Sequence, residues 1–406
     1  MPEDHAPAPP VAATDTPDRD FPPSRDAALA RLAEFVPHAG RDYAGRRNHD
    51  LPGHPHVSVL SPYLRHRVIS EAEVCAAVLE RHAKSAAEKY VQEVVWRTYF
   101  KGWMERRPGT WDAYLRGVAK GRDRLATEGG LRRGWEAACE GETGIAPFDD
   151  GAKELVRTGY VHNHARMWFA SVWIHTLGLP WELGADFFLR HLLDGDPASN
   201  TLGWRWVAGL HTRGKTYLAR PGNIRRYTGE RYAEADLSRL SKEAPALEEP
   251  APAAPSDMPG DAPIPKGRVG LILHEDDLHP AYLMARGLEA AEAMVLLNPE
   301  GRSPLEVARK VRDFTDALTA DAADRLPCDV AAITRDPAEV SAWAKGFDAV
   351  VAPYAPVGPG RAVLDRVETE IVRPIRDWDL AAWPHATAGY FKVKAKIPAL
   401  LEAADG

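Results

Sequence analysis

The sequence predicts a multidomain chain, with an all-helical domain followed by a small parallel-sheet α/β domain. Three observations lead to this fold class. Residues 25–235 carry apolar side chains at helical spacing, residues 236–266 form a linker rich in Pro, Ala and acidic residues, and residues 267–406 alternate short β-branched runs with helical segments. Residues 1–24 are rich in Pro, Ala and Asp, and we expect them to be disordered.

The helical prediction rests mainly on two segments, 70–107 and 159–179, whose apolar residues recur every three or four positions. Ser70 and Glu73 have the spacing of a capping box, which predicts a helix start.

The α/β prediction rests on short apolar runs separated by helical segments at 303–326 and 337–346. The runs are RVGLILH, AMVLLN, CDVAAI and FDAVVAPY. This alternation is typical of βαβ units, so the strands should form a parallel sheet.

Charge is unevenly distributed along the chain. Residues 1–24 carry 1 Lys+Arg and 5 Asp+Glu (net -4), residues 25–235 carry 31 and 25 (net +6), and residues 236–406 carry 19 and 28 (net -9), which together give -7. This pattern suggests that only the helical region meets a polyanion. The alternative is that a net charge of +6 over residues 25–235 is too small to have a function.

We expect a cytoplasmic protein. Cys75, Cys139 and Cys328 lie far apart with no CxxC spacing, which suits a reducing compartment and cannot supply an iron–sulfur cluster. The sequence has no apolar run long enough to span a bilayer, and its acidic, Pro-rich start does not resemble a secretory signal.

Two helical segments place unusual side chains on one face. Asn163, Arg166 and Met167 stand at i, i+3 and i+4, a trio that suits a large polar-aromatic ligand or forms a surface stripe. Neighbouring His162 and His164 point to different helix faces, so no metal site is predicted.

The second such segment contains Glu93, Trp96 and Arg97 at the same spacing. A Trp and a Glu together can read a nucleobase, by stacking and by hydrogen bonding. The alternative is an ordinary Glu–Arg pair on a solvated helix.

Residues 192–209, LLDGDPASNTLGWRWVAG, place two aspartates and two tryptophans close together. Asp194 and Asp196 should lie at a helix end or turn, and a buried carboxylate there needs a partner such as Arg166. Trp204 and Trp206 point in roughly opposite directions on a helix, so one can face a cofactor and the other a cavity.

Residues 56–70 place Ser58 and Ser61 around Leu60, just before Pro62. Hydroxyls and free backbone N–H groups at a helix start can hold a phosphate, although an ordinary N-cap is the alternative.

Together these segments resemble the FAD-binding domain of the DNA photolyase and cryptochrome family. A Tyr is followed in order by SxLSPYL, QExxWR, TG…HNxxRM, DGDxxxN and GWxW. The motifs start here at Tyr43, Ser58, Gln92, Thr143, Asp194 and Gly203, and the likeness covers roughly residues 40–230.

The resemblance implies one non-covalently bound FAD. The two serines would lie near its diphosphate, Asn200 near flavin N5, and the Arg166–Asp194 pair beside the isoalloxazine. The implied cofactor-binding residues are Tyr43, Ser58, Leu60, Ser61, Asn163, Arg166, Asp194, Asp196 and Asn200.

Among family members, the substrate side is most similar to that of cyclobutane pyrimidine dimer photolyases. Such enzymes place Glu, Trp, Asn, Met and a second Trp around the flipped-out lesion, and all five types stand at the matching positions. The implied substrate-binding set is Glu93, Trp96, Asn163, Met167 and Trp206, with Arg97 beside Trp96. Arg213, Lys215, Arg225 and Arg226 would grip DNA phosphates, or form an ordinary solvated surface.

For catalysis, the resemblance implies roles for Glu93 and Asn200 and for an electron relay. Trp204 would be the relay member next to the flavin and Trp181 the middle member. The outermost position falls near Glu128, with Trp135 and Trp111 as substitutes.

Two departures from the family pattern stand out. Val57 replaces a Thr that is often found near the diphosphate. The family's α/β antenna domain usually precedes the FAD domain, whereas here an α/β region follows it. Residues 269–283 faintly resemble the start of that antenna domain, which suggests a permuted order, and an unrelated small α/β domain is the alternative.

We therefore expect a lyase that uses FAD and blue light to repair cyclobutane pyrimidine dimers in single- or double-stranded damaged DNA. Reduced flavin would donate an electron to the flipped-out lesion. The alternative is a cryptochrome-like photoreceptor that binds FAD and signals through its C-terminal domain without repair. A third interpretation is a helical protein that has lost FAD. The sequence identifies neither an antenna chromophore nor a partner of the C-terminal domain.

Overall fold

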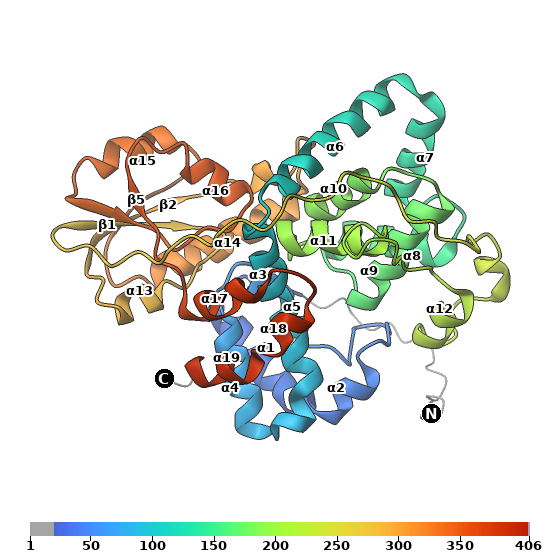
Figure 1. Ribbon diagram of the computed structural model, residues 1–406, viewed down its shortest axis with the longest axis horizontal. Helices are drawn as coiled ribbons and strands as arrows, with labels where there is room; N and C mark the ends of the chain where they lie inside the picture. The colour runs from blue at the N-terminus through green and yellow to red at the C-terminus, as the bar shows by residue number, and fades with distance from the viewer. Residues whose placement is uncertain (1–19, 405–406) are drawn as a thin grey trace.

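The computed structural model describes residues 20–404 (Figure 1). Most of the segment expected to be disordered therefore lies outside the described residues. Helices make up residues 25–237, apart from their connections. Their bounds are α1 Arg25–Phe35, α2 Arg41–Arg46, α3 Ser61–Arg65, α4 Glu71–Arg81, α5 Lys84–Glu105, α6 Gly109–Thr127, α7 Gly129–Glu140, α8 Ala146–Thr158, α9 Asn163–Ser171, α10 Trp181–His191, α11 Pro197–Val207 and α12 Pro221–Tyr227.

The predicted capping box opens α4. The Ser70 side chain accepts a hydrogen bond from the Glu73 backbone N–H, and the Glu73 carboxylate accepts one from the Ser70 N–H. The long helical pattern of residues 70–107 is broken at His82, whose backbone is extended. The His82 ring bonds the Val36 carbonyl at 2.6 Å, a distant contact that periodicity does not reveal. The break frees α5 to run through the middle of the molecule (Figure 1).

The predicted parallel sheet is confirmed, with five strands in the order β3-β2-β1-β4-β5. The bounds are β1 Val269–His274, β2 Ala290–Leu296, β3 Val330–Thr334, β4 Ala349–Val351 and β5 Ile371–Val372. The connecting helices are α13 Ala281–Ala285, α14 Arg309–Asp324, α15 Pro337–Ala344 and α16 Pro359–Leu364. Every residue of β1, the central strand, is buried. The two-residue β5 is too short for its alternation to stand out in the sequence.

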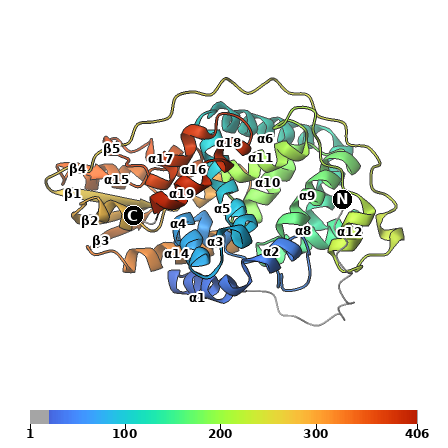
Figure 2. The ribbon, with the colours of Figure 1, turned by 60° about the horizontal axis from the view of Figure 1, so that its bottom comes forward.

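After the sheet, the chain returns to the helical region. Three helices follow it, α17 Asp377–Ala382, α18 Phe391–Lys394 and α19 Ile397–Ala404. They lie beside α4 and α5 in both ribbon views (Figures 1 and 2). Trp378 Nε1 donates to Thr98 Oγ1 at 2.9 Å, and Trp383 packs so closely on Gly102 that a Cβ there would lie 2.6 Å from its ring. The C-terminal end thus covers one side of α5.

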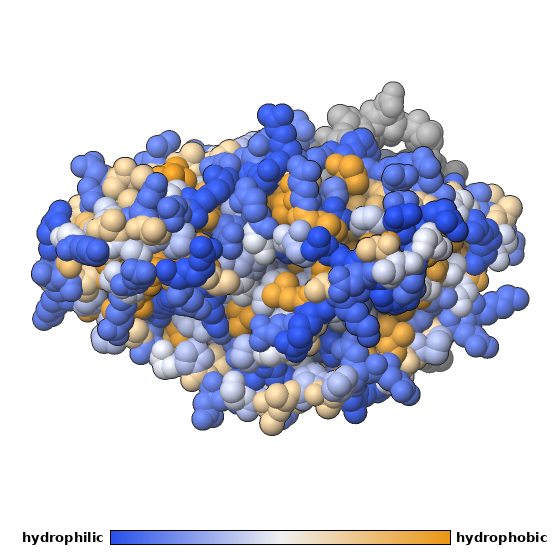
Figure 3. All heavy atoms as spheres, turned by 90° about the horizontal axis from the view of Figure 1, so that it is seen from above, coloured by the Kyte–Doolittle hydropathy of each residue, from blue (hydrophilic) through white to orange (hydrophobic). Residues whose placement is uncertain are grey.

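The predicted linker contains no helix or strand between residues 242 and 266 and crosses the molecule as a long strap (Figure 2). Seen from above, the surface is mainly hydrophilic, with apolar side chains showing in patches near its middle (Figure 3). Within residues 20–404, no helix is both long and apolar enough to cross a membrane.

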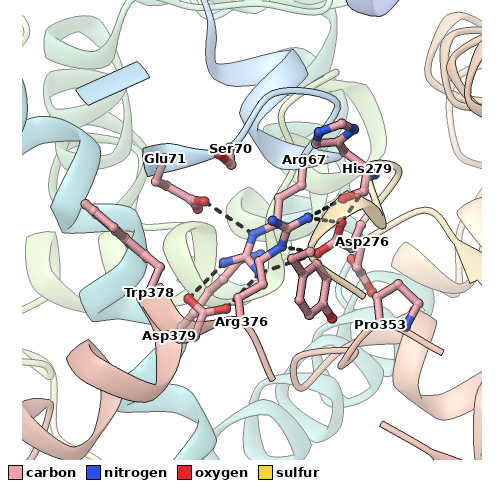
Figure 4. Close-up of polar contacts among 12 residues, drawn as sticks. Arg67, Ser70, Glu71, Asp276, His279, Pro353, Arg376, Trp378 and Asp379 are labelled. Carbon is pink, nitrogen blue, oxygen red and sulfur yellow. Dashed lines mark hydrogen bonds and ion pairs between the residues drawn. The ribbon is translucent and has the colours of Figure 1, made fainter. Parts of the chain in front are cut away.

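Buried charges fill the junction between the helical region and the α/β region. Arg67 bonds both carboxylate oxygens of Asp379, at 2.7 and 2.9 Å, and its Nε lies 3.3 Å from Glu71 (Figure 4). Arg376 likewise bonds both oxygens of Asp277, at 2.6 and 2.7 Å. The network balances cations and carboxylates: Arg65, Arg67, Arg97, Lys101, Arg302 and Arg376 against Glu71, Asp196, Glu275, Asp276, Asp277 and Asp379. Pairing outweighs desolvation at Arg376 and Asp277, whereas burial still raises the pKa of Glu275.

Candidate functional site

A cavity of about 680 Å³ opens among α2, α3, α5, α9, α10 and α11. Its size is in the usual range for a cofactor pocket. The structure brings together around it every residue expected to hold FAD or the lesion, and of the expected relay tryptophans it includes Trp204 but not Trp181. The predicted residues that line the cavity are Tyr43, Ser58, Leu60, Ser61, Glu93, Trp96, Arg97, Asn163, Arg166, Met167, Asp194, Asp196, Asn200, Trp204 and Trp206.

The expected pairing of Arg166 with Asp194 is confirmed. Arg166 Nη2 lies 3.0 and 2.8 Å from the two Asp194 oxygens, and its Nε donates to the Val161 carbonyl at 2.8 Å. Arg166 comes from α9, and Asp194 from the turn that follows α10. The pair therefore holds a cation and an anion in a set orientation at the cavity wall.

Asp196 begins α11 as its N-cap and accepts a hydrogen bond from the Ser199 N–H at 2.8 Å. Its other oxygen lies 3.3 Å from Arg97 and 3.6 Å from Lys101. Burial raises the pKa of Asp196, but these cations outweigh that effect and hold the pKa well below its usual range. Asp196 is thus ionised at neutral pH and joins the cavity wall to the buried charge network.

The α11 helix also presents polar groups to the cavity, and one of them has no hydrogen-bond partner among the described residues. Asn200 donates from Nδ2 to the Ala185 carbonyl at 2.8 Å, which fixes the side-chain amide at the cavity wall. The buried Ser199 hydroxyl has no hydrogen-bond partner among the described residues. A Cβ at Gly203 would meet no atom within 4 Å, so this stretch of helix faces open space. Such groups are typical of a ligand site.

The Ser58–Ser61 segment turns sharply at Val59, whose φ of +53° lies in the left-handed region. This conformation is strained for a β-branched residue, and such strain often accompanies a functional site. Ser61 is the first residue of α3, a short helix with Pro62 in its first turn. The turn brings the side chains of Ser58, Leu60 and Ser61 to the cavity.

Helix α5 presents Glu93, Trp96 and Arg97 to the same cavity. The Glu93 carboxylate is paired with Arg47 of the segment that follows α2. Trp96 stacks on Tyr390, with ring centroids 3.7 Å apart and planes 10° apart. Burial and the Glu93 charge raise the pKa of Tyr43, which lies near the same pair.

The two tryptophans of α11 behave differently, although both line the cavity. Trp204 is 3% exposed and meets Trp173 edge-on at 6.0 Å, whereas Trp206 is partly exposed and tilts against Tyr217 at 5.8 Å. Trp173 belongs to a π-helical turn that extends α9, a feature frequent at functional sites.

Trp181 lies outside the cavity wall. Its Nε1 donates to Glu249 of the linker at 2.8 Å, and its ring lies 5.9 Å from Tyr114, which is 5.0 Å from Trp111. Trp111 therefore lies in an aromatic row with Trp181, while Glu128 forms an exposed ion pair with Arg124.

Sequence reasoning missed several lining residues. Arg47 stands four residues after Tyr43, a helical spacing that could have suggested it. Tyr90, Phe100, Tyr160 and His211 also line the cavity, and no motif singled them out. Burial lowers the pKa of His211 to about 4, so this ring is neutral at physiological pH.

Comparison with known proteins adds to this geometry. Residues 90–231 match the family model described as the FAD binding domain of DNA photolyase. These residues of the helical region are thus similar to a photolyase-type FAD-binding domain.

Similar curated proteins are named deoxyribodipyrimidine photo-lyase. The one from Vibrio cholerae is 31% identical over 205 residues, which cover 48% of this chain and 41% of the relative. One from Thermus thermophilus is 35% identical over 202 residues, covering 48% and 45%. The one from Streptomyces griseus is 31% identical over 255 residues, covering 57% and 53%. The chain thus spans about half the length of these relatives.

Among solved structures, a cryptochrome of Synechocystis is 26% identical, with a TM-score of 0.44 and coverage of 56% of this chain and 48% of that one. A class III photolyase of Agrobacterium tumefaciens is 27% identical, with a TM-score of 0.41 and coverage of 51% and 43%.

The cavity residues fit the FAD of a photolyase-type domain. The unpartnered Ser199 hydroxyl, the open face at Gly203, the Arg166–Asp194 pair and the serine turn all line the cavity. This donor set suits a ligand that carries both a polar ring system and phosphates. FAD is the cofactor of this domain type.

Proposed function

We propose that this chain repairs cyclobutane pyrimidine dimers in DNA, in a reaction driven by blue light and dependent on FAD. One observation carries the proposal. The residues that resemble a dimer-binding set line the same cavity as the residues that would hold the cofactor. A flipped-out lesion could therefore reach the redox-active ring without an intervening layer of protein.

On the substrate side, Trp96 and Trp206 would stack on the two joined bases. The Arg47–Glu93 pair lies at the edge of this space, and its guanidinium N–H groups could bond the base carbonyls. Donors that are already in place stabilise negative charge as it develops on those carbonyls. Asn163 and Met167 would complete the contact surface from α9.

When bound and reduced, FAD supplies the light-excited electron donor. Arg166 and Asp194 would orient it, and Asn200 would bond the ring edge. Trp204 would relay electrons to the ring from the buried aromatic side chains behind it. We further propose that Trp181, Tyr114 and Trp111 form the outer part of this route.

The direct test is repair itself. The purified, flavin-loaded and reduced protein would be mixed with an oligonucleotide that contains one thymine dimer, under blue light and in the dark. We expect loss of the dimer only in the light. No loss from a protein that is yellow and photoreducible would contradict the repair proposal.

Variants on α5 separate repair from folding. Glu93→Gln and Trp96→Ala should repair poorly while they retain flavin, because both residues lie on the proposed substrate side. Lys89→Ala changes an exposed residue of the same helix and serves as the control. Unchanged repair in both site variants would remove them from the proposed mechanism.

The second candidate is a cryptochrome-like photoreceptor that does not repair DNA. Two contacts favour it, because Glu93 is already paired with Arg47 and one face of Trp96 is already covered by Tyr390. Tyr390 comes from the C-terminal end, so a change in the cavity could be transmitted there. Light-dependent protection changes at residues 386–396 in hydrogen exchange, with no repair, would support this candidate.

A further inference from the structure

The C-terminal end contains a short basic stretch inside an otherwise acidic region. Residues 380–401 contain Lys392, Lys394 and Lys396 but no Asp or Glu, although residues 236–406 together carry 19 basic and 28 acidic side chains. The lysines alternate with other residues directly after Tyr390 and Phe391, in the order YFKVKAK. Aromatic side chains interleaved with lysines are typical of surfaces that bind nucleic acid.

The fold attaches this stretch to the edge of the cavity. Tyr390 stacks on Trp96, a cavity-lining residue, and its hydroxyl donates to the Gln92 carbonyl at 2.9 Å. The Tyr99 hydroxyl donates to the Ala388 carbonyl at 2.8 Å, which gives the stretch a second attachment to α5. Both ribbon views place α18 beside α5 (Figures 1 and 2).

Phe391 exposes a large aromatic side chain to solvent. Its side chain is 80% exposed, the largest value among the exposed large hydrophobic residues of the described chain. Its neighbour Tyr390 is 5% exposed, so the buried ring anchors the segment and the next ring projects outward. An exposed aromatic ring offers a face on which a base can stack.

The lysine side chains around Phe391 indicate a partner with negative charge. Lys392 and Lys396 are exposed, whereas Lys394 is paired with Glu88 of α5 at 3.3 Å. Lys392 has only the Thr387 hydroxyl nearby, at 3.1 Å, and no carboxylate pairs with it or with Lys396 among the described residues. Two free cations beside an exposed ring fit a phosphate backbone and a base.

We infer that residues 390–396 form a second DNA-contacting element at the rim of the cavity. Phe391 stacks on a base next to the nucleotides that enter the cavity, and Lys392 and Lys396 contact the flanking phosphates. This inference rests on the proposed function, since that function makes DNA the partner. It adds a contact outside the matched residues 90–231, from the helices that follow the sheet.

Phe391→Ala tests the stacking contact. Binding of the flavin-loaded full chain to a labelled, dimer-containing oligonucleotide would be followed in the dark by fluorescence anisotropy. We expect about five- to tenfold weaker binding, because one base loses its stacking partner. Ile333→Ala, a change at a 46% exposed residue of β3, is the control and should bind like the wild type. A 2-aminopurine placed beside the dimer should be quenched by wild type and less so by Phe391→Ala.

Lys392→Gln with Lys396→Gln tests the phosphate contacts. Loss of two phosphate contacts should reduce the slope of log K against log salt by about 1 to 2 units and leave flavin content unchanged. Lys345→Gln changes an exposed residue directly after α15 and provides a single-lysine control away from the cavity.

The outcomes separate the inference from the proposed function. Wild-type binding that all three C-terminal substitutions leave unchanged would overturn the inference alone. A wild type that binds neither damaged nor undamaged DNA would contradict both. Unchanged DNA binding combined with a Phe391→Ala shift from dimer to monomer in light scattering would assign the exposed ring to a contact between copies of the chain.

Discussion

The cavity and the junction beneath the α/β sheet are both built from buried polar groups, but they use those groups differently. In the junction, Arg67 and Arg376 each meet both oxygens of a carboxylate, and cations and anions balance. In the cavity wall, the Ser199 hydroxyl has no partner among the described residues, and Gly203 faces open space. Charge pairing holds the two regions together, although several junction atoms, both Glu275 carboxylate oxygens among them, also lack a hydrogen-bond partner among the described residues. The distinguishing feature of the cavity wall is therefore its open face, which leaves room for a ligand.

The loop from Asp194 to Asp196 belongs to both regions. Asp194 turns to Arg166 at the cavity, while Asp196 pairs with Arg97 and Lys101 of the network. Arg65 also donates to the Gly195 carbonyl between them, at 2.8 Å, and pairs with Asp276 of the α/β region. A substitution in this loop should therefore act on binding or on stability according to which aspartate it changes.

The largest effect is expected in the junction. Arg67→Met should lower the free energy of unfolding by about 3–5 kcal/mol, because Asp379, Asp277 and Glu71 lose their shared cation. Urea denaturation would measure the change. Arg124→Met breaks an exposed pair on α6 and should have no measurable effect. Equal stability of the two variants would contradict the structural role of the network.

The next effect depends on pH. Burial alone would lower the pKa of His54, but the nearby carboxylates of Asp50, at 3.4 Å, and Glu154, at 3.1 Å, raise it to about 9 from an ordinary 6.5. A raised pKa stabilises the fold fully below pH 6.5, and this stabilisation is lost as pH rises through 9. The difference corresponds to about 3 kcal/mol at most.

Thermal melting between pH 6 and pH 9.5 would measure it. His54 has a φ of +49°, a conformation that Asn tolerates, so His54→Asn is the matched variant. The wild type should lose more thermal stability than His54→Asn over this range. Parallel pH profiles would show that the His54 charge does not contribute.

The two aspartates of the loop give the sharpest contrast between cavity and junction. Asp194→Asn should weaken FAD binding about 10- to 100-fold, because Arg166 loses a charged hydrogen-bond partner, and leave stability nearly unchanged. Asp196→Asn should instead lower stability, since Arg97 and Lys101 lose their counterion. Flavin fluorescence titration and urea denaturation would be measured on both. The reverse pattern would mean that the two roles are exchanged.

The smallest effect is expected at Gly203. Gly203→Ala should stabilise α11 by about 0.5–1 kcal/mol, because alanine is the better helix former. The new methyl group projects into open space at the cavity wall and should reduce flavin content. Gly130→Ala on α7 also meets no neighbour, but it lies away from the cavity and should leave flavin content as in the wild type. Full flavin content in Gly203→Ala would place the cofactor away from this face.

The sequence was most informative where motifs and short-range spacing carry the information. The capping box at Ser70, the parallel sheet and the shared face of Asn163 and Arg166 are all local patterns. The cavity set was also predictable, because an ordered series of motifs identifies a domain type even when each motif alone is weak. Trp181 was grouped with that set by resemblance, although it lies behind the wall rather than in it.

Local patterns in the sequence therefore predict most of the helices and strands and the side chains that share a helix face, but not the break at His82 or the short strand β5. These properties follow from backbone periodicity and from the burial of apolar side chains. Three contacts emerge only from the folded chain: Tyr390 covers Trp96, Glu249 meets Trp181, and Arg67 meets Asp379. Each of these contacts joins residues far apart in the chain, and its partner depends on the path of the whole backbone, which no local pattern records.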